Sequence, residues 1–583
     1  MRAPALLLTL LACAPPDGEP SADTGPDASL ADAVDPRTYL PIEDQAVRAS
    51  VLVRGVRPSV QEIRAVRADP DRLPALVDRW LQEPGFGRTV RAVHDDALHM
   101  RSIDLVYPPA GPVAKATLQQ MGAALAEEPL ALIEHVVTSG QPYSAIVTSD
   151  RTVLDRRAAQ IWSHHTYDPQ GPDVQVVGWT DGRPAAGILS TNALWARHRS
   201  AGSNHHRGRA ELVADALLCE SFLGRDVPIT GDVDLADEDA VAEALDHRPE
   251  CVGCHQALDP LAAHLWTVHP EYTPAAVGVA YLGGCRQPFL ELCYPFNPVR
   301  PAYELGRKLL QLRGPGYYGQ ASATLGDVGA ALAADPRFAR CAVQRLWSYA
   351  AQVPLDEVPF EVVAPLQQDF EASGLDYRAL VRAVALHPDF RALDASRPEV
   401  ADRIPGPLVV RPWQHAATIA QLTGFAFEVD VDLFRCRLPG LDLFCQGITD
   451  VATDATFGFR AITGGTDGAR VLSPTHTPTP LKLLFAEALA EEAAAHVVAR
   501  DLAQVDGALL GLVDRATEDE ATVRAQLVEL HAGVLAEVVP PDDEAIDATW
   551  TLWSTVRART GDTRVAWRAT LSALLQAPRL GIH

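Results

Sequence analysis

The sequence predicts a mainly α, multi-domain helical protein with a small β-hairpin element. Apolar residues recur with the spacing of a helix over most of the chain. With 583 residues, the chain is long enough for several domains of roughly 100–200 residues each. Its composition, 47% hydrophobic and 21% charged, supplies enough apolar residues for several hydrophobic cores.

Helical patterns begin after residue 45. Ser59 and Glu62 have the spacing of a capping box, which indicates that a helix begins there. Residues 113–137 predict a long helix. We expect this helix to break near Pro129, because a proline inside a helix removes a backbone hydrogen bond.

The middle of the chain mixes helical and extended patterns. Residues 174–179 partly alternate and are followed by the turn Asp181-Gly182, which predicts a short hairpin. Residues 209–222 and 237–246 have helical patterns and lead into a pair of cysteines. The predicted divisions are 1–13, a signal ending at Cys13; 14–44, a disordered tether; 45–170, a helical domain; 171–275, the hairpin and the cysteine pair; 276–396, a helical domain; 397–407, a linker; and 408–583, a C-terminal helical domain.

The N-terminus has the pattern of an export signal. Arg2 precedes a short apolar run, residues 5–12, which ends directly before Cys13. This ending resembles a bacterial lipobox, in which the cysteine becomes the lipidated first residue, and it predicts lipidation at Cys13. An ordinary signal peptide and a start codon placed too early are the alternatives. The prediction places the protein in the bacterial cell envelope, lipid-anchored, facing the periplasm or the cell surface.

The charge of the chain argues against nucleic acid as a partner. The formal net charge is −25, and no dense cluster of Lys and Arg is present. No stretch offers about 18 consecutive apolar residues, so we expect no transmembrane helix. The lipid anchor is then what holds the protein at the membrane.

Cys251-Val252-Gly253-Cys254-His255 is the one sharp chemical motif. Two thiols about one helical turn apart can each add to a vinyl group of the same porphyrin, and the adjacent imidazole can bind the iron. At the observed counts of 9 Cys and 18 His, chance gives only about 0.004 occurrences of this pattern. The motif predicts one covalently bound haem c, with Cys251 and Cys254 as tethers and His255 as the proximal iron ligand.

Three other interpretations of the cysteine pair stay open. A redox-active disulfide usually lies in a thioredoxin-like βαβ context, which the flanking sequence lacks. A zinc site needs a second pair of ligands, for which His264 and His269 are candidates. A plain structural disulfide is the third alternative.

Blocks of sequence around the motif occur in an order known from other proteins. They are Gly187-Ile188-Leu189-Ser190, His206-Arg207-Gly208-Arg209, Leu217-Leu218-Cys219 and the segment from Cys251 to Pro260. In these blocks the chain resembles the planctomycete-type cytochrome proteins, which are exported multi-block c-type haem lipoproteins, mostly of unknown function. The resemblance implies a cytochrome c-like haem segment within residues 171–275. The chain departs from the family pattern after Pro260, where Leu261 replaces the usual glycine.

The distal ligand of the iron is constrained by the methionines. All three precede the motif: they are Met1, Met100 and Met121. A methionine downstream of the motif, the usual distal ligand of simple monohaem cytochromes, is therefore impossible. His206 is the tentative distal ligand, ahead of Met100 or Met121 and an open site. His264 is disfavoured and His269 is marginal, because a helix rises only about 1.5 Å per residue and both follow the proximal ligand closely.

Further cysteines, histidines and carboxylates could form sites. Cys285 with Cys293, and Cys436 with Cys445, are predicted disulfides, which leaves Cys219 and Cys341 either paired or as buried free thiols. The histidine pairs His164-His165 and His205-His206 are either ligands or ordinary surface or core residues. An acidic cluster lacks the pattern of an EF-hand loop and therefore favours a solvated loop and the start of a helix. Its members are Asp232, Asp234, Asp237, Glu238 and Asp239.

Together these patterns predict an envelope-anchored c-type haem protein whose role is one-electron transfer with an unknown redox partner in the cell envelope. A surface-binding or assembly protein with a structural haem, and a haem enzyme of peroxidase type, are the alternatives. Whether the protein is an enzyme is left open.

Overall fold

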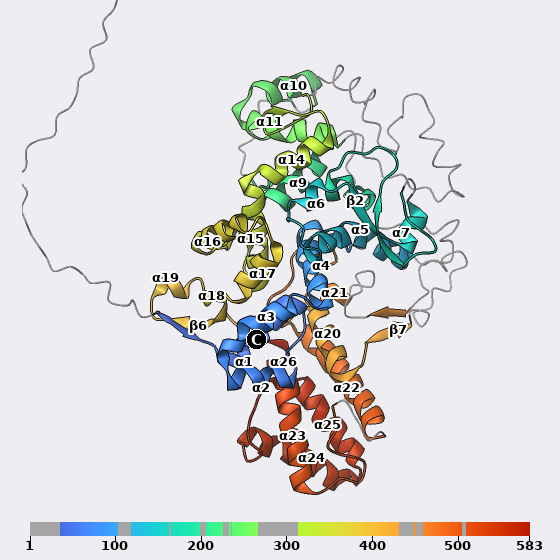
Figure 1. The fold of residues 1–583 in the computed structure, drawn as a ribbon, viewed down its shortest axis with the longest axis vertical. Helices are drawn as coiled ribbons and strands as arrows, with labels where there is room; N and C mark the ends of the chain where they lie inside the picture. The colour runs from blue at the N-terminus through green and yellow to red at the C-terminus, as the bar shows by residue number, and fades with distance from the viewer. Residues whose placement is uncertain are drawn as a thin grey trace, which may run out of the picture.

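The structure is a computed structural model. It describes residues 35–102, 118–162, 165–198, 206–225, 233–234, 236–265, 313–430, 448–450, 459–503 and 509–583. The described part of the chain is mainly helical and contains four small two-stranded sheets (Figure 1). The mainly α class predicted from the sequence is confirmed.

The first helices pack around one another in the N-terminal part. They are α1 (Ile42–Arg54), α2 (Val60–Ala68), η1 (Pro70–Arg72), α3 (Leu73–Trp80), α4 (Pro84–Leu98) and α5 (Leu118–Thr138). The predicted capping box of α2 is confirmed: Glu62 N donates to Ser59 Oγ at 3.3 Å, and Ser59 N donates to Glu62 Oε2 at 2.8 Å. The predicted break at Pro129 is wrong, since α5 continues through it. Leu130 and Leu132 are fully buried beside it, and their packing outweighs one lost hydrogen bond.

A two-stranded sheet follows. The elements here are α6 (Ala145–Thr148), β2 (Arg151–Asp155), α7 (Arg156–Ile161), β3 (Val174–Gly178), η3 (Gly187–Ser190) and α8 (Asn192–Arg197). Strand β3 pairs antiparallel with the upstream strand β2, with Val153 opposite Val176. The hairpin predicted around Asp181-Gly182 is therefore wrong. Pro184 follows that turn and cannot donate a ladder hydrogen bond, and the chain enters η3 instead.

The cysteine pair lies in the next group of elements. These are α9 (Arg207–Leu218), α10 (Glu238–His247), α11 (Pro249–His264), β4 (Gly316–Tyr317), β5 (Gln320–Ala321), α14 (Leu325–Ala334), α15 (Pro336–Ala351), η5 (Leu355–Glu357), α16 (Phe360–Ala372), α17 (Tyr377–Ala385), α18 (Pro388–Arg391), β6 (Ala392–Ala395) and α19 (Pro398–Ala401). The two helices predicted before the cysteines are confirmed as α9 and α10. The tether predicted over residues 14–44 extends too far, because Arg37–Tyr39 forms strand β1 and pairs with β6.

The C-terminal part is again helical. It contains α20 (Pro412–Thr423), β7 (Glu428–Asp430), β8 (Ile448–Asp450), α21 (Phe459–Ile462), α22 (Pro480–Asp501), α23 (Glu520–Leu530), the π-helix η8 (His531–Leu535), α24 (Glu544–Thr560), α25 (Thr563–Leu575) and α26 (Pro578–Gly581). The chain end returns to α1: the His583 carbonyl accepts from Arg48 of α1, and also from Leu408 N, which lies just before α20.

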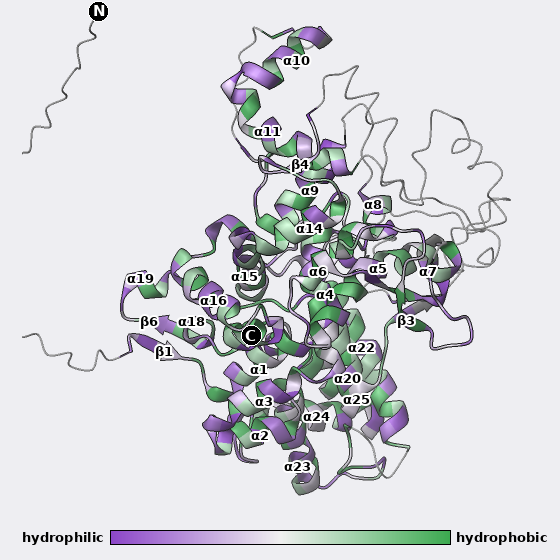
Figure 2. Cartoon of the chain, turned by 45° about the horizontal axis from the view of Figure 1, so that its top comes forward, coloured by the Kyte–Doolittle hydropathy of each residue, from purple (hydrophilic) through white to green (hydrophobic). Residues whose placement is uncertain are grey.

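The buried apolar residues form two cores in the described part of the chain. The first runs from Ala46 to Val410, with Ala536 added, and the second runs from Ile419 to Leu580. The first core contains residues of four of the predicted divisions, whose boundaries stay predictions. Helices α10 and α11 lie at one end of the long axis and α23 and α24 at the other (Figure 1). Hydrophilic and hydrophobic residues alternate along α10 and α11 (Figure 2). None of the described helices is long and apolar enough to cross a bilayer.

Candidate functional site

Helix α11 places the three motif side chains together. Its first helical residue is Pro249, which suits this position because proline has no N–H to leave unpaired. Cys254 and His255 follow Cys251 by three and four residues, spacings that place each of them on the same face of a helix as Cys251. Both cysteines are free thiols, and both are half-buried. One face of α11 therefore carries two thiols and one imidazole.

The His255 imidazole is held from one side by a carboxylate. His255 Nδ1 donates to Asp259 Oδ1 at 3.0 Å, one helical turn further along α11. The side chain of His255 is 22% exposed and that of Asp259 is 10% exposed. Because Nδ1 carries the proton of this hydrogen bond, Nε2 keeps its lone pair and is the nitrogen that can bind a metal.

A third residue completes the arrangement. Arg207, at the start of α9, donates to both oxygens of the same carboxylate: Nε to Oδ1 at 2.6 Å and Nη2 to Oδ2 at 3.1 Å. Burial alone would raise the pKa of Asp259, but the hydrogen bonds from His255 and Arg207 outweigh it and lower that pKa. Asp259 is therefore a carboxylate at neutral pH.

An arginine also approaches the thiols. Arg225 Nη1 lies 3.8 Å from Cys254 Sγ, and the same guanidinium pairs with Glu220. Glu220 follows directly after Cys219 at the end of α9. The cysteine face of α11 is thus connected to both ends of α9.

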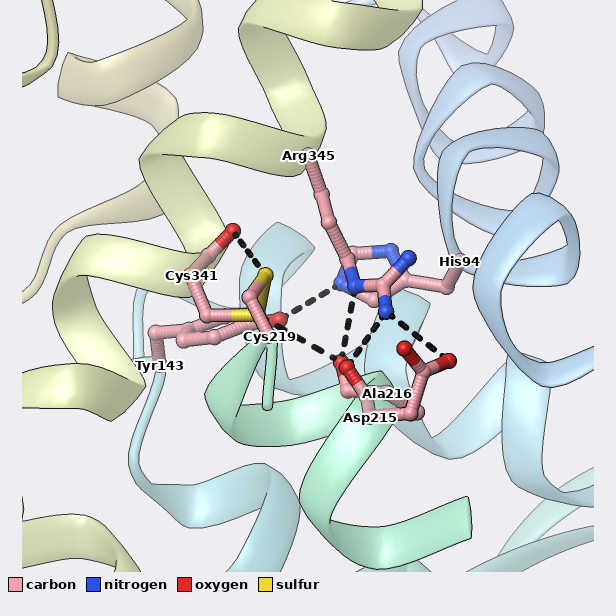
Figure 3. Close-up of a disulfide and its surroundings, with 7 residues drawn as sticks. All are labelled: His94, Tyr143, Asp215, Ala216, Cys219, Cys341 and Arg345. Carbon is pink, nitrogen blue, oxygen red and sulfur yellow. Dashed lines mark hydrogen bonds and ion pairs between the residues drawn. A yellow bond between two sulfur atoms is a disulfide. The ribbon is translucent and has the colours of Figure 1, made fainter. Parts of the chain in front are cut away.

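Helix α9 is fixed at its C-terminal end. Cys219 caps the helix and forms a disulfide with Cys341 of α15, with a Cα–Cα distance of 5.2 Å (Figure 3). On the same helix α15, Arg345 donates to the carbonyls of Asp215 and Ala216 (Figure 3). A guanidinium at a helix C-terminus also complements the helix dipole. The alternative that Cys219 and Cys341 are buried free thiols is wrong.

A small cavity lies beside Arg345 and the end of α9. His94, Tyr143 and Arg345 are among its lining residues, and its volume of about 20 Å³ suits one water molecule. His94 Nδ1 donates to the Val90 carbonyl at 2.7 Å. Tyr143 donates to His94 Nε2 at 2.8 Å, as Figure 3 shows. Burial lowers the pKa of His94 to about 4, so this histidine is neutral.

The zinc alternative is not compatible with His264. This residue closes α11, ten residues after Cys254, which corresponds to about 15 Å along a helix axis. A zinc–sulfur bond is only about 2.3 Å long, so one ion cannot bind both side chains. His264 Nε2 is instead hydrogen-bonded to Ser322 Oγ at 2.7 Å. Among the residues that the structure describes, no three His, Cys, Asp or Glu side chains are arranged so that they could hold a metal ion.

The candidates for the distal ligand lie at different places in the fold. His206 is 3% exposed and directly precedes Arg207, with a positive φ of 56° that few residues other than glycine adopt. Met100 and Met121 are both fully buried in the first core. Since His264 stands nine residues after His255 on one helix, about 13 Å along its axis, it cannot reach the opposite face of a porphyrin held by His255. The choice of His206 stays a prediction.

The other candidates are explained by local structure or lie outside the described residues. His165 Nε2 is hydrogen-bonded to the carbonyls of Ala159 and Trp162, an ordinary structural role. Asp237 caps α10 and accepts from two backbone N–H groups, as expected of a helix start. The predictions that lie outside the described residues concern Cys13, His164, His205, Asp232, His269, Cys285, Cys293, Cys436 and Cys445.

Sequence reasoning missed Asp259, Arg207 and Arg225. The four-residue spacing of His255 and Asp259 was a usable signal, because such pairs meet on a helix surface. Arg207 stands 52 residues from Asp259 in the chain, and only the tertiary packing of α9 against α11 brings them together. No family model matches the chain, and no curated protein or solved structure is significantly similar to it.

Proposed function

We propose that this chain is an envelope-anchored c-type haem protein that performs one-electron transfer. The observation that carries the proposal is the face of α11, where two free thiols stand beside a histidine whose Nδ1 is tied to Asp259. A plain disulfide has no need for a histidine oriented in this way. A zinc site could use such a histidine, but it also needs further ligands, and no group of side chains that could hold a metal ion occurs among the described residues. A haem iron does, because its proximal imidazole must present a lone pair.

The donor set fits a covalently bound haem. Cys251 and Cys254 would hold the group: each S–H would add across a vinyl double bond of the porphyrin and form a thioether, with no net loss or gain of electrons. His255 would offer Nε2 as the proximal ligand. When bound, the haem supplies an iron that cycles between the ferric and ferrous states.

The Cys219–Cys341 disulfide supports export. Disulfides persist in oxidising compartments such as the periplasm, and c-type haem is attached there too. In such a compartment, an adjacent pair of half-exposed thiols that stays unpaired needs another use, and thioether formation is one. The apolar run before Cys13 fits the same location, with the membrane reached through a lipid anchor.

The position of α11 also supports electron transfer. This helix lies at one end of the molecule, where a partner in the envelope could approach it (Figure 1). The net charge of −25 favours a redox partner with a positive surface.

A haem enzyme of peroxidase type is a second candidate, favoured by one observation. The hydrogen bond from His255 to Asp259 makes the imidazole a stronger donor to iron, which suits oxygen chemistry as well as electron transfer. The two functions differ at the distal side. Peroxide, cyanide or azide shifts the ferric spectrum if the distal position is open, whereas an electron carrier with two protein ligands resists them.

The covalent haem is tested directly on purified protein. After acid–acetone extraction, the wild type should keep its haem on the polypeptide, and the reduced pyridine complex should show the spectrum of two thioether links. Cys251→Ser and Cys254→Ser should each shift that spectrum towards one link, and the double variant should lose all haem on extraction. As a matched control, Ser221→Ala, a change beside Cys219, should keep both links. Loss of all haem from the wild type would overturn the proposal, as would one equivalent of bound zinc.

A further inference from the structure

We propose that Asp259 and Arg207 set the reduction potential of the iron held by His255, the carboxylate lowering it and the guanidinium raising it. The inference rests on the proposed function, because it concerns the ligand through which the iron is bound. Both groups are positioning residues that act through the imidazole.

The carboxylate acts through one hydrogen bond. His255 Nδ1 donates to Asp259 Oδ1 at 3.0 Å, and only 10% of the Asp259 side chain is exposed, so water screens the interaction weakly. A ligand imidazole that donates to a carboxylate gains basicity at its other nitrogen. The more basic Nε2 stabilises the ferric state over the ferrous state, which lowers the potential.

The guanidinium acts on the same oxygen. Arg207 Nε donates to Asp259 Oδ1 at 2.6 Å, so this oxygen accepts from both His255 and Arg207, while Nη2 binds Oδ2 at 3.1 Å. The always-charged guanidinium draws electron density from the carboxylate and weakens its pull on the imidazole proton. Arg207 therefore opposes Asp259, and the balance between them fixes the potential.

The fold keeps this balance constant. Arg207 opens α9, and the other end of that helix is fixed by the Cys219–Cys341 disulfide and by Arg345. The one electron that would convert ferric to ferrous iron in a titration comes from a small-molecule mediator.

The experiment is a mediated redox titration of purified holoprotein. Asp259→Asn keeps an acceptor for Nδ1 but removes the charge, so it should favour the ferrous state about tenfold, an upward shift of about 59 mV. Arg207→Gln should shift the potential downward. In the Asp259→Asn background, Arg207→Gln should have a smaller effect, because the carboxylate through which it acts is gone. Arg207→Lys should restore part of the wild-type potential.

Matched controls remove the same charges elsewhere. Asp239 on α10 and Arg340 on α15 are exposed, so Asp239→Asn and Arg340→Gln should leave the potential unchanged. The ferric electron paramagnetic resonance spectrum gives a second readout. The g values report the donor strength of the imidazole, so Asp259→Asn and Arg207→Gln should move them in opposite directions.

The outcomes separate this inference from the proposed function. If the wild type holds no covalent haem, the proposed function fails first, in the extraction assay. If haem is held but the Asp259 and Arg207 variants leave the potential unchanged, or shift it in the same direction, this inference alone is overturned. If Asp259→Asn does not load haem, the inference is tested by the reduction potentials of Arg207→Gln, Arg207→Lys and the wild type. Equal potentials in these three proteins overturn it.

Discussion

Cys219 and Cys341 stand 122 residues apart in the chain and are joined by a disulfide that ties the end of α9 to α15. The loop that this bond closes contains the whole of α10 and α11, and with them the motif cysteines. Arg345, one turn along α15 from Cys341, binds the same end of α9. The placement of α9 against α11 therefore depends on a covalent link as well as on packing.

Removing this disulfide should destabilise the first core. We expect the double variant Cys219→Ser, Cys341→Ser to lose about 2–5 kcal/mol of unfolding free energy, because the unfolded chain regains the freedom of a long loop. Thermal unfolding followed by circular dichroism measures the loss as a lower midpoint. Reductant should lower the wild-type midpoint more than that of the double variant, in which only the predicted pairs Cys285–Cys293 and Cys436–Cys445 are left to reduce. Equal midpoints for wild type and double variant would contradict a stabilising link.

Acid should destabilise the protein through its buried histidines. Burial lowers the pKa of His94 to about 4 from its ordinary value near 6.5, so below pH 6.5 the unfolded chain binds a proton that the folded one resists. This histidine's contribution is present above pH 6.5 and is lost as the pH falls towards 4, on the order of 3 kcal/mol in all. Burial lowers the pKa of His198 and His415 as well, so their contributions add to the same slope.

The measurement for His94 is the pH dependence of the unfolding midpoint. His94→Gln should be less stable than wild type at pH 7, because its bonds to Val90 and Tyr143 are lost, but should show a shallower decline between pH 6.5 and 5. The exposed His247 on α10 offers the control His247→Gln, which should keep the wild-type slope. An unchanged slope in His94→Gln would show that His94 is not among the groups responsible.

His206 should be the distal ligand if the haem is six-coordinate with two histidines. His ligation lowers the potential relative to Met ligation and gives no Met–iron charge-transfer band in the ferric near-infrared spectrum. His206→Ala should change that spectrum, whereas His264→Ala should not, because His264 is bound to Ser322. A Met–iron band in the wild type, or an unaltered spectrum in His206→Ala, would remove His206 from consideration.

Cys13 should carry the lipid. Cells fed a fatty-acid analogue should label the wild type and should not label Cys13→Ser, because the lipobox cysteine is the acceptor of the lipid. Fractionation should find the wild type with membranes and the variant in the soluble envelope fraction. Equal labelling of the two proteins would reject the lipid anchor.

Local signals in the sequence were sufficient for most helices. The capping box at Ser59 and the acidic start of α10 both depend on side chains within three residues of the helix they begin, so their prediction needs no tertiary information. The predicted break at Pro129 is wrong because the burial of α5 outweighs the hydrogen bond that proline removes from the helix. Strand β3 was expected, but its partner β2 lies upstream, and short sequence patterns do not choose between partners.

In the candidate site, too, some residues could be predicted from the sequence and others could not. Cys251, Cys254 and His255 were found because the chemistry of the motif fixes their spacing. Asp259 follows the same helical spacing and could have been found. Arg207 could not, since its contact with Asp259 depends on how two helices pack. From the sequence, a Cys219–Cys341 disulfide could be inferred only because the other cysteines had been assigned to other pairs. In the structure, the two residues are joined by a disulfide.

The disulfide also determines the path of mechanical force through the molecule. Once the contacts of His583 with Arg48 and Leu408 have broken, a chain held at a membrane near its first residues and pulled from its far end transmits tension along the backbone to Cys219. From there the load crosses the sulfur–sulfur bond to Cys341, and residues 220–340 carry none of it. Helix α11 lies inside that unloaded stretch, so tension strong enough to extend the flanking segments would leave Cys251, Cys254 and His255 unstretched until the disulfide is reduced.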